Sequence, residues 1–480
     1  MLVTTARGGL SVLLLLLIPV VWLGVYHFPA LLTFDSASLP QKHDQTIPVK
    51  EESQDVKEHV IAPEKGHVSW VEPAPTVAES ENPLPVDTIP WPPAEAPAET
   101  STQPGYHIIK SKTSLDGRYF DIDFKYPAIN PNIIPHPTEP DTFIIIAQKH
   151  KYGSTGIFFF VELVCNAVFQ NYKLVCTEPA SILPISATSS GNCEGKLDFF
   201  ALSVGPHDAR VFWGPDRPYV LFGSNSMHNC FGQWLQDFRM LTVWHQLTDL
   251  RGPYRLATDI AKPPPYQPIE KNWFIFWDLD SNIHAHYDIF PHRSFAGIAP
   301  DGSASEDLAL RSREADDMCF ATHGPKLTPA SPDTEGREES IHQATNSLSI
   351  TLCRRADPSC EPSPTNTFIL TIFHLKRHLN LHSVYEPYVL LFSAVAPFKT
   401  FAIGSKPLWI HGRRKAGEEG TVSDGQSEMM YITSVNWKAN GSRYQGYLDD
   451  VVMVGFGVED RRAAGIDVLA EDLLGGLAYC

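Results

Sequence analysis

An acid and a base lie close together in the stretch "GPHDARVFW" at residues 205–213. Asp208 and Arg210 precede an apolar run, and a turn then leads to a second run, "YVLF", at 219–222. A positioned carboxyl group can act as the acid or base of inverting glycosyl transfer, and an arginine can bind a phosphate or carboxylate bidentately. We expect Asp208 to be the general acid/base and Arg210 to bind substrate. The alternatives are an Asp208 that caps a strand turn and an Arg210 in a structural ion pair with Asp208 or Asp450.

Other segments that lead into apolar runs carry residues that could recognise a sugar. Asn130 and Asn132 offer donors and acceptors for hydroxyl groups, although Asn-Pro is also common in turns. Lys271, Asn272 and Trp273 combine a charge, an amide and an aromatic face. The alternative for Trp273 is a place in the core. We expect these five residues to bind substrate.

Four further residues complete the predicted substrate-binding set. Lys149 ends the run "FIIIAQK", with a solvated turn as its alternative, and His374 and Tyr385 come from a later pair of runs. Asp449 and Asp450 are adjacent. Because successive side chains of a strand point to opposite faces, only one of these two can face the site, and we choose Asp450.

The sequence predicts neither a metal site nor a cofactor. The "HAH" at 284–286 places two histidines on one strand face, but no third ligand follows nearby. The "DLDS" at 278–281 lacks the rest of a calcium loop.

Short β-rich runs separated by turns occupy residues 105–480. Aromatic and β-branched residues dominate these runs, for example "GIFFFVELV" (156–164), "TFILTIFHL" (367–375) and "DVVMVGFGV" (450–458). Residues 230–247 are expected to be irregular or strand, and the polar insertions 298–340 and 411–428 to be surface loops. The body is therefore predicted to be all-β, either a propeller or a large sandwich.

A degenerate repeat favours a five-bladed β-propeller. Polar clusters precede paired apolar runs five times, at 130–132, 207–210, 270–273, 341–350 and 444–450. The innermost strand of each propeller blade begins beside a central channel. The polar clusters would then converge on one funnel, which is how Asp208 and Arg210 would come to face a shared pocket.

The N-terminal part is predicted to anchor the protein in a membrane. Residues 8–32 contain no Asp, Glu, Lys or Arg. This run is longer than a cleaved signal peptide and close to the span of a bilayer. We expect a cytosolic tail at 1–7, a signal anchor at 8–32, a disordered Pro/Glu-rich stem at 33–104 and a lumenal catalytic domain at 105–480, a type II layout typical of Golgi enzymes.

The cysteines agree with an oxidising lumen. All eight follow residue 160. Cys165 with Cys176 and Cys353 with Cys360 are the nearest candidate pairs, while free buried thiols are the alternative for several others. Asn440, in the sequon Asn-Gly-Ser, is the predicted glycosylation site.

The charge balance excludes one class of partner. The formal net charge is −17, and residues 33–104 supply about half of the excess with 13 Asp/Glu against 4 Lys. This pattern indicates a solvated acidic segment, and no basic region suited to nucleic acid is present.

The set of motifs resembles the five-bladed propellers of the β-mannoside phosphorylases and β-1,2-mannosyltransferases over about residues 120–470. The motifs are "NPN" at 130–132, the G-x-x-D-x-R strand start, "EKNW" at 270–273, an H-x-K-like fourth blade and "YLDDVVMVGFGVED" at 447–460. In the phosphorylases the second-blade motif is Glu-Asp-Pro-Arg, and its Asp is the proton donor. The resemblance assigns that role to Asp208. His207 and Ala209 depart from the motif, where Glu and Pro are usual.

The resemblance implies transfer of a sugar, expected to be a β-linked mannosyl unit, to a glycan acceptor. A nucleotide-sugar donor, with GDP-mannose as the working choice, follows from the Golgi-like layout and from no motif. The alternatives are a hydrolase or phosphorylase on the same propeller, and a non-catalytic propeller that binds glycans or proteins.

Overall fold

A computed structural model describes residues 103–152, 158–188, 192–243, 251–329, 338–379, 382–419, 421 and 426–480. All of these belong to one of two compact units of the chain, Pro90–Cys480. The expected cytosolic tail, anchor and almost all of the stem lie outside the described residues. Among the described residues, no helix has the length and apolar character needed to cross a bilayer.

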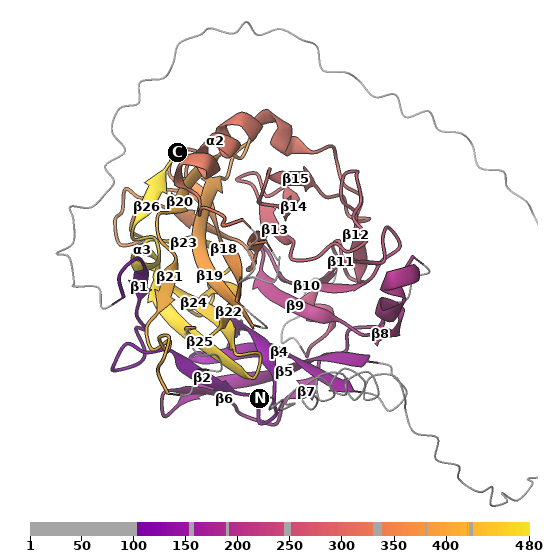
Figure 1. The fold of residues 1–480 in the computed structure, drawn as a ribbon. Coiled ribbons are helices and arrows are strands. Elements are labelled where there is room, and N and C mark those ends of the chain that lie inside the picture. Colours follow the sequence, from indigo (N-terminus) through magenta and orange to yellow (C-terminus); the bar gives the residue numbers. More distant parts are fainter. Residues whose placement is uncertain are drawn as a thin grey trace, which may run out of the picture. The chain divides into compact units, whose positions relative to one another are not determined.

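The described part of the chain is mostly β (Figure 1), with sheets of two, three, four, seven and ten strands. The main strands are described below as five antiparallel groups, of which groups 1 and 5 are the two halves of the ten-stranded sheet and meet at a parallel pair of strands. Group 1 contains β3 (Ile129–Pro135), β4 (Thr142–Tyr152), β5 (Phe158–Gln170) and β6 (Lys173–Cys176). Group 2 contains β9 (His207–Trp213), β10 (Pro218–Asn225), β11 (Phe231–Asp237) and β12 (Thr258–Ile260). Group 3 contains β13 (Phe274–Trp277), β14 (Ile283–Asp288) and β15 (Ser294–Gly297).

The last two groups follow the same order along the chain. Group 4 contains β17 (Leu348–Thr351), β18 (Thr367–Leu379), β19 (His382–Ser393) and β20 (Thr400–Gly404), and β16 (Ser340–Gln343) also pairs with β18. Group 5 contains β22 (Met430–Trp437), β24 (Val451–Val458), β25 (Arg462–Leu469) and β2 (Phe120–Asp123). Because β2 pairs with both β25 and β6, the start of the body joins group 5 to group 1.

Short elements complete the body. The short strands are β1 (His107–Ile109), β7 (Ser181–Ile182), β8 (Ser203–Val204), β21 (Leu408–Ile410), β23 (Gln445–Tyr447) and β26 (Leu477–Tyr479). The helices are α2 (Arg313–His323), α3 (Ala470–Leu473) and the 3-10 turns η1 (Gly195–Leu202), η2 (Phe238–Met240) and η3 (Leu308–Arg311). Residues 230–247 were expected to be irregular or strand, and their described part forms β11 and η2.

Two sequence interpretations need correction. The insertion 298–340 is more than a surface loop, because α2 buries Cys319 and Phe320 in the core. The insertion 411–428 also reaches inside, where Arg413 forms a buried ion pair with Glu386 at 3.1 Å. Both segments contain few apolar residues, so nothing in the sequence indicated that they pack against the body. A few buried side chains are enough to hold a mostly polar segment in place.

The fifth polar cluster was also assigned to the wrong strand. Residues 444–450 precede β24, which is the second strand of group 5, whereas the first strand is β22. Neighbouring antiparallel strands run in opposite directions. Asp450 therefore begins a strand at the opposite end of the group from the residues that begin the first strands.

Two buried asparagines join the first strands of different groups. The inner edge of a sheet leaves backbone N–H and C=O groups unpaired, and buried groups of this kind need partners. The Nδ2 of Asn132 in β3 donates to Ala209 O at 2.8 Å, and its Oδ1 accepts from Val211 N at 3.1 Å. Asn346, just before β17, bonds in the same way to O and N of Val435 in β22, at 2.7 and 3.1 Å.

Two more side chains complete the connections. The Nδ2 of Asn436 in β22 donates to Val211 O at 3.4 Å, and Oγ of Ser347 donates to Ile275 O in β13 at 2.7 Å. Through these bonds the first strands of groups 1 to 5 are linked to one another around a common centre (Figure 1).

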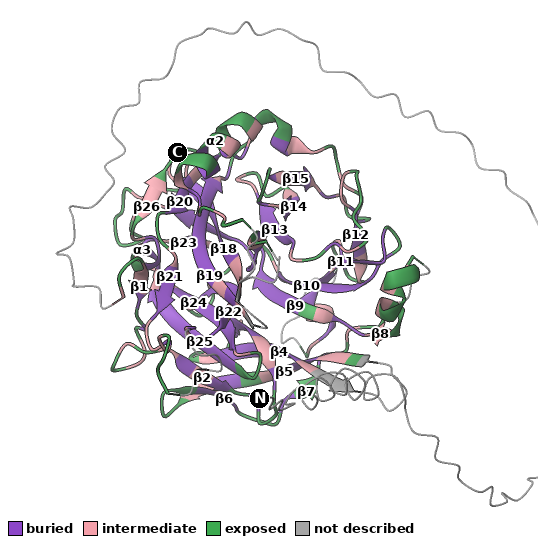
Figure 2. Cartoon of the chain, viewed as in Figure 1, coloured by how far each residue is buried: buried purple, intermediate pink, exposed green. Residues whose placement is uncertain are grey.

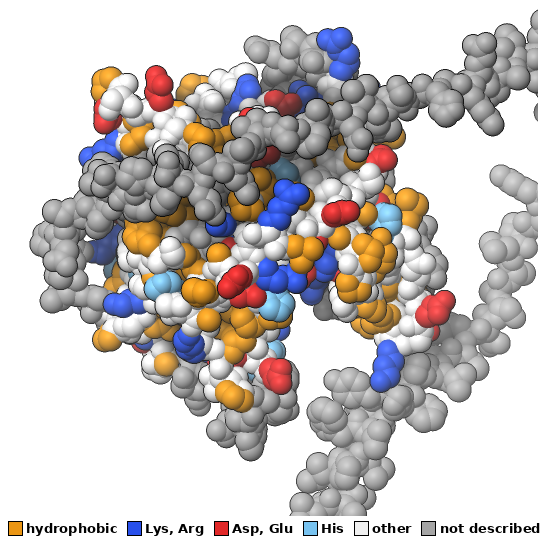
Figure 3. Space-filling view, turned by 90° about the horizontal axis from the view of Figure 1, so that it is seen from above, with side chains coloured by type: hydrophobic (Ala, Val, Ile, Leu, Met, Phe, Trp, Pro, Cys, Tyr) orange, Lys and Arg blue, Asp and Glu red, His pale blue; other side chains and the backbone are white. Residues whose placement is uncertain are grey.

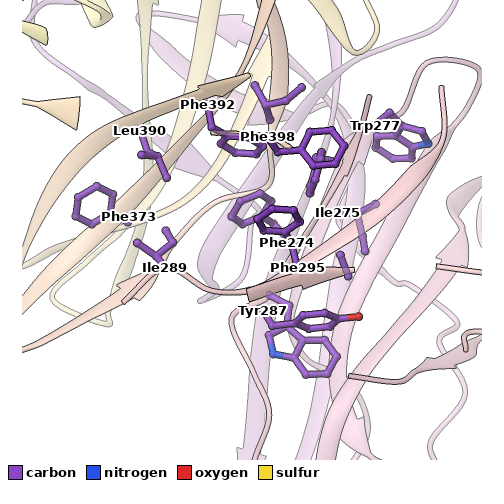
Figure 4. Packing of buried hydrophobic residues seen from close by; sticks show 14 of the residues in the cluster. Phe274, Ile275, Trp277, Tyr287, Ile289, Phe295, Phe373, Leu390, Phe392 and Phe398 are labelled. Carbon is purple, nitrogen blue, oxygen red and sulfur yellow. The ribbon is translucent and has the colours of Figure 1, made fainter. Parts of the chain in front are cut away.

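The core between groups 3 and 4 is aromatic. Figure 4 shows Phe274, Phe295, Phe392 and Phe398 packed together, and the centroids of the Phe295 and Phe398 rings lie 5.5 Å apart. Each fully buried side chain of this size stabilises the fold by about 1.5–3 kcal/mol. Figure 2 shows the buried residues concentrated in the strands and the exposed ones in loops and on the outer side of α2.

All eight cysteines are paired. The pairs Cys165–Cys176 and Cys353–Cys360 confirm the two candidates taken from the sequence. Cys193–Cys230 and Cys319–Cys480 join more distant positions, so the alternative of free thiols is wrong.

The surface carries charges of both signs. On the face shown in Figure 3, acidic and basic side chains are interspersed, and the face is hollowed at its lower middle.

Candidate functional site

A cavity of about 140 Å³, here called the Asp208 cavity, lies where the first strands begin. It is lined by His207, Asp208 and Arg210 of β9, by Lys271, Asn272 and Trp273 before β13, by Ala344, and by side chains that include Phe200 and Phe231. The structure thus brings together five of the residues predicted from the sequence, from two segments about 60 positions apart. Among the described lining residues, Asp208 is the only carboxylic acid.

Three polar residues at the starts of β3, β9 and β13 have left-handed backbone conformations. The φ angles are 56° for Asn130, 49° for Asp208 and 62° for Asn272. Non-glycine residues rarely adopt this region, Asn and Asp are the commonest exceptions, and such strain is concentrated at functional sites. Asn130 is close to Asp208, because its Nδ2 donates to Asp208 Oδ1 at 2.8 Å. The same left-handed backbone conformation therefore occurs at the start of three first strands, at Asn130, Asp208 and Asn272.

Two side chains of group 1 hold the backbone of Asp208 in this conformation. Gln148 in β4 and Glu162 in β5 are direct cross-strand partners. Gln148 Oε1 accepts from Asp208 N at 3.2 Å, and Glu162 Oε1 accepts from Ala209 N at 3.1 Å. Asp208 itself is exposed, whereas the following residues of β9 are buried, as the colours of β9 in Figure 2 show. The backbone of Asp208 is thus fixed from its buried side, while the residue itself is exposed.

Glu162 is a fully buried carboxyl group beneath Asp208. Its side chain has no exposed surface, and Oε2 has no hydrogen-bond partner among the described residues. Burial raises the pKa of Glu162 well above its usual range, and the negative charge of Asp208 adds to this shift, whereas the Ala209 N–H and Arg210 oppose it. The shift favours the protonated form of Glu162, in which Oε1 holds the backbone without placing a second negative charge beside Asp208.

The raised pKa of Glu162 predicts a pH-dependent stability. The folded state keeps its proton above the ordinary value of 4.5, where the unfolded chain loses it. The contribution of Glu162 to the free energy of unfolding is therefore greatest below pH 4.5. It falls as the pH rises towards the pKa of Glu162 in the folded state, by at most about 1.4 kcal/mol per pH unit. In Glu162→Gln this loss should disappear, as measured by urea unfolding between pH 4.5 and 8. The exposed Glu178→Gln is the control and should follow the wild type; a Glu162→Gln curve parallel to the wild type contradicts a protonated Glu162.

Arg210 does not form the ion pair that was its alternative. Its guanidinium is buried, with Nη1 donating to Asp208 O at 2.8 Å and Nε to Ala344 O at 3.4 Å. No carboxylate among the described residues lies within ion-pair distance of it. Arg210 therefore brings a positive charge to the floor of the Asp208 cavity.

A cluster of histidines and tyrosines lies near Arg210 and Lys271, although none of its members lines the Asp208 cavity. The ring of His374 is 4.8 Å from that of Tyr431 and 5.5 Å from that of Tyr385, and His342 lies 5.9 Å from His374, centroid to centroid. Burial lowers the pKa of His342 to about 4, with Lys376 and Lys271 adding to the shift. Burial likewise lowers the pKa of His374 well below its usual range, with His342 and Arg210 contributing. These rings are neutral hydrogen-bonding groups at neutral pH.

The remaining residues of the cavity differ in accessibility. Lys271 is exposed at the rim. Burial lowers the pKa of His207 to about 4, an effect that Asp208 opposes and Lys271 reinforces. Trp273 lines the cavity but is a core residue, 4% exposed, with its ring 4.7 Å from that of Tyr287.

Four other predicted residues lie elsewhere. The side chain of Asn132 forms the hydrogen bonds to the backbone of β9 described above. The Nζ of Lys149 lies over the Tyr126 ring, 4.6 Å from its centroid. Asp450 and Asn440 line a different cavity of about 690 Å³, here called the Arg443 cavity, which shares no lining residue with the first. Asp450 is not with Asp208, because its strand runs in the opposite direction.

Sequence reasoning missed Glu162, Gln148, His342 and Tyr431. Glu162 had a usable signal, since an acid within the apolar run "FFFVELV" is rarely buried without a purpose. His342 lies in the polar cluster at 341–350, but nothing distinguished it there, and Gln148 and Tyr431 lie in ordinary strand patterns. Among the described residues, no group of three His, Cys, Asp or Glu side chains could hold a metal ion.

Comparison with known proteins places the chain in no family. No family model matches it, and no curated protein matches it. Among solved structures it is similar to a β-1,2-mannobiose phosphorylase from Listeria innocua, 10% identical, with 76% of this chain and 95% of that chain covered and a TM-score of 0.39.

Two further similar structures are named for activities other than that of a phosphorylase. A GDP-Man-dependent mannosyltransferase from Leishmania mexicana is 9% identical, with 78% of this chain and 92% of that chain covered and a TM-score of 0.36. An α-L-arabinofuranosidase from Lactobacillus brevis is 10% identical, with 71% and 90% covered and a TM-score of 0.35. These identities and TM-scores establish neither a family nor an activity for this chain.

Proposed function

We propose that this protein is an inverting glycosyltransferase whose general base is Asp208. The observation that carries the proposal is the composition of the Asp208 cavity, in which one exposed carboxylate stands among two cationic side chains, Arg210 and Lys271. Asp208 would accept the proton of an acceptor hydroxyl while the acceptor oxygen bonds to the anomeric carbon. The bond from that carbon to the leaving group breaks at the same time.

The presence of one carboxylate among the described residues that line the cavity argues for transfer over hydrolysis. Inverting hydrolases need a second carboxylate about 6.5–9.5 Å from the first to activate water. Glu162 does not fill this role, because it is buried and already accepts from Ala209 N. A phosphorylase is the second candidate, since Arg210 and Lys271 would also suit inorganic phosphate; Asp208 would then protonate the glycosidic oxygen.

The two cations support a donor with an anionic leaving group, such as a nucleotide sugar. Asn130, Asn272 and Tyr385 are proposed to bind sugar hydroxyls, whereas His374 is fully buried and its Nε2 already accepts from Ile432 N. The volume of about 140 Å³ is small beside the about 300–1,000 Å³ of pockets for drug-sized ligands, and suits a single sugar ring. The mannosyl unit and the acceptor glycan are proposed from the motif resemblance at residues 120–470.

We also propose that the five strand groups are the blades of a propeller and that residues 105–480 are its catalytic domain. The links between the first strands of all five groups support this architecture. Placement in the secretory lumen, behind an anchor at 8–32, is supported by four disulfides and no free cysteine among the described residues.

A donor and acceptor screen tests the proposal. The purified full chain should release nucleoside diphosphate from one sugar nucleotide only when a glycan acceptor is present, and the product should have the inverted anomeric configuration. Release of sugar to water alone would favour a hydrolase. Phosphate-dependent release of sugar phosphate from an oligosaccharide would favour a phosphorylase.

A further inference from the structure

The Arg443 cavity lies at the other end of two strands that reach the Asp208 cavity. In β9, Asp208 is the second residue, and Pro215, just past its end, lines the Arg443 cavity. Before β13, Asn272 lines the Asp208 cavity, and Asp278, just after its end, lines the other one. Seven residues of strand span roughly 23 Å. The two cavities are therefore separate sites.

One wall of the Arg443 cavity is fixed by Asn440. Its Nδ2 donates to His136 O at 2.7 Å and to Glu139 O at 3.1 Å, so both of its N–H hydrogens are used. These bonds tie the loop after β22 to the turn after β3. The wall is held in place before any ligand arrives, which lowers the entropy cost of binding.

The opposite wall is fixed around Arg355. Its Nε donates to one carboxylate oxygen of Asp450 at 3.1 Å and its Nη2 to the other at 2.5 Å, and its guanidinium lies 4.2 Å from the centroid of the Tyr447 ring. Asp449 accepts from the backbone N of Arg355. The disulfide Cys353–Cys360 closes this loop. Arg355 and Asp450 thus neutralise each other and support the wall.

Several polar groups are left to meet a ligand. Arg443 is exposed, lies 5.8 Å from the centroid of the Trp213 ring and has one long bond, from Nη1 to Pro215 O at 3.4 Å. Among the described residues it forms no ion pair. Ser281 and Ser442 also line the cavity, and their hydroxyl groups have no hydrogen-bond partner among the described residues.

The charges of the lining indicate what the ligand is. Two arginines, Arg355 and Arg443, stand against two acids, Asp278 and Asp450, so the formal charges cancel. The volume of about 690 Å³ falls within the about 300–1,000 Å³ range of ligand pockets. A cavity of this size with hydroxyl, amide and guanidinium groups and no net charge suits an uncharged molecule rich in hydroxyl groups.

We propose that the Arg443 cavity is a second carbohydrate-binding site, which holds a neutral oligosaccharide at the end of the body opposite Asp208. The choice of a carbohydrate rests in part on the proposed function, whereas the size and neutrality of the site do not. Such a site would hold one part of a long glycan while the end of that glycan reacts in the Asp208 cavity, or would keep the enzyme bound to a surface that carries glycans.

A glycan attached to Asn440 is the competing occupant. An Asn side chain that carries a glycan keeps one N–H hydrogen, and both hydrogens of Asn440 are used here. Attachment would therefore break one of the bonds to His136 O and Glu139 O. We expect the folded protein to carry no glycan at Asn440.

Calorimetric titration with a neutral trimannoside tests the site in the Asp208→Asn background, where no turnover interferes. Arg443→Ala and Ala439→Trp should remove one binding event or weaken it at least tenfold; the tryptophan fills the cavity from an exposed position that leaves the sequon intact. Lys271→Ala, at the other cavity, should leave that event unchanged. Thermal unfolding checks that each variant is folded.

Three results would overturn the proposal. These are no trimannoside binding at 10 mM by the parent protein, binding that survives both Arg443→Ala and Ala439→Trp, and a glycan found on Asn440 by mass spectrometry. Because binding is measured without turnover, a protein that binds here yet transfers no sugar would refute the proposed glycosyltransferase and leave this site standing.

Discussion

Replacing Asp208 with asparagine should lower kcat by about 10²–10⁴-fold, the usual contribution of a general acid or base. The change removes the ionisable group and little else. Asparagine tolerates the left-handed backbone at φ 49° as well as aspartate does, and its Oδ1 can still accept from Asn130 Nδ2. Initial-rate measurements with the donor and acceptor found in the screen would give kcat and KM, and we expect KM to change far less than kcat.

A matched control separates chemistry from backbone effects. Asp141 is also an exposed aspartate with a left-handed backbone, at φ 53°, and it lies in the turn between β3 and β4 and lines neither cavity. Asp141→Asn should leave kcat unchanged. An Asp208→Asn enzyme that keeps more than a tenth of wild-type kcat, with folding intact, would remove Asp208 from the role of general base.

Replacing Asn346 with alanine should lower the free energy of unfolding by about 2–6 kcal/mol. Asn346 satisfies both the N–H and the C=O of Val435 in the buried centre, where each unsatisfied group costs about 1–3 kcal/mol. Water cannot easily replace it, because Asn346 is 1% exposed. Guanidinium unfolding of the full chain, followed by tryptophan fluorescence, would measure the change.

Asn436 provides the matched control for this substitution. It is equally buried and loses the same atoms on replacement, but it makes one bond of 3.4 Å, to Val211 O, and its Oδ1 has no partner among the described residues. Asn436→Ala should therefore cost at least about 2 kcal/mol less than Asn346→Ala. If the two variants lose the same free energy of unfolding, the loss comes from the volume of the removed side chain and not from the hydrogen bonds to Val435.

The sequence was a good guide wherever the signal is local. Runs of aromatic and β-branched residues bounded by turn residues predicted the strands, since such side chains fit the pleated surface of a sheet. The pairs Cys165–Cys176 and Cys353–Cys360 were accessible because their members are 11 and 7 positions apart. Cys319–Cys480, 161 positions apart, had no such signal.

The site was predictable in part for the same reason. Asp208 and Arg210 lie in the first half of β9, and Lys271, Asn272 and Trp273 lie just before β13. They were found because each lies near the start of the first strand of a group, and first strands begin at one end of the body. Asp450 was misplaced because the same type of pattern preceded a second strand. Glu162 and Gln148 act from the strands of another group, through contacts with the backbone of Asp208 and Ala209 that no sequence spacing encodes.

By itself, the sequence determined that the body is made of short strands, that polar turn residues introduce them, and that an acid and an arginine stand at the start of one. Only the tertiary structure decided which strand ends meet. That decision depends on strand direction and on long-range bonds such as those of Asn132 and Asn346. These arise from packing between distant segments, and so the neighbours of Asp208 could be named only once the groups were assembled around their common centre.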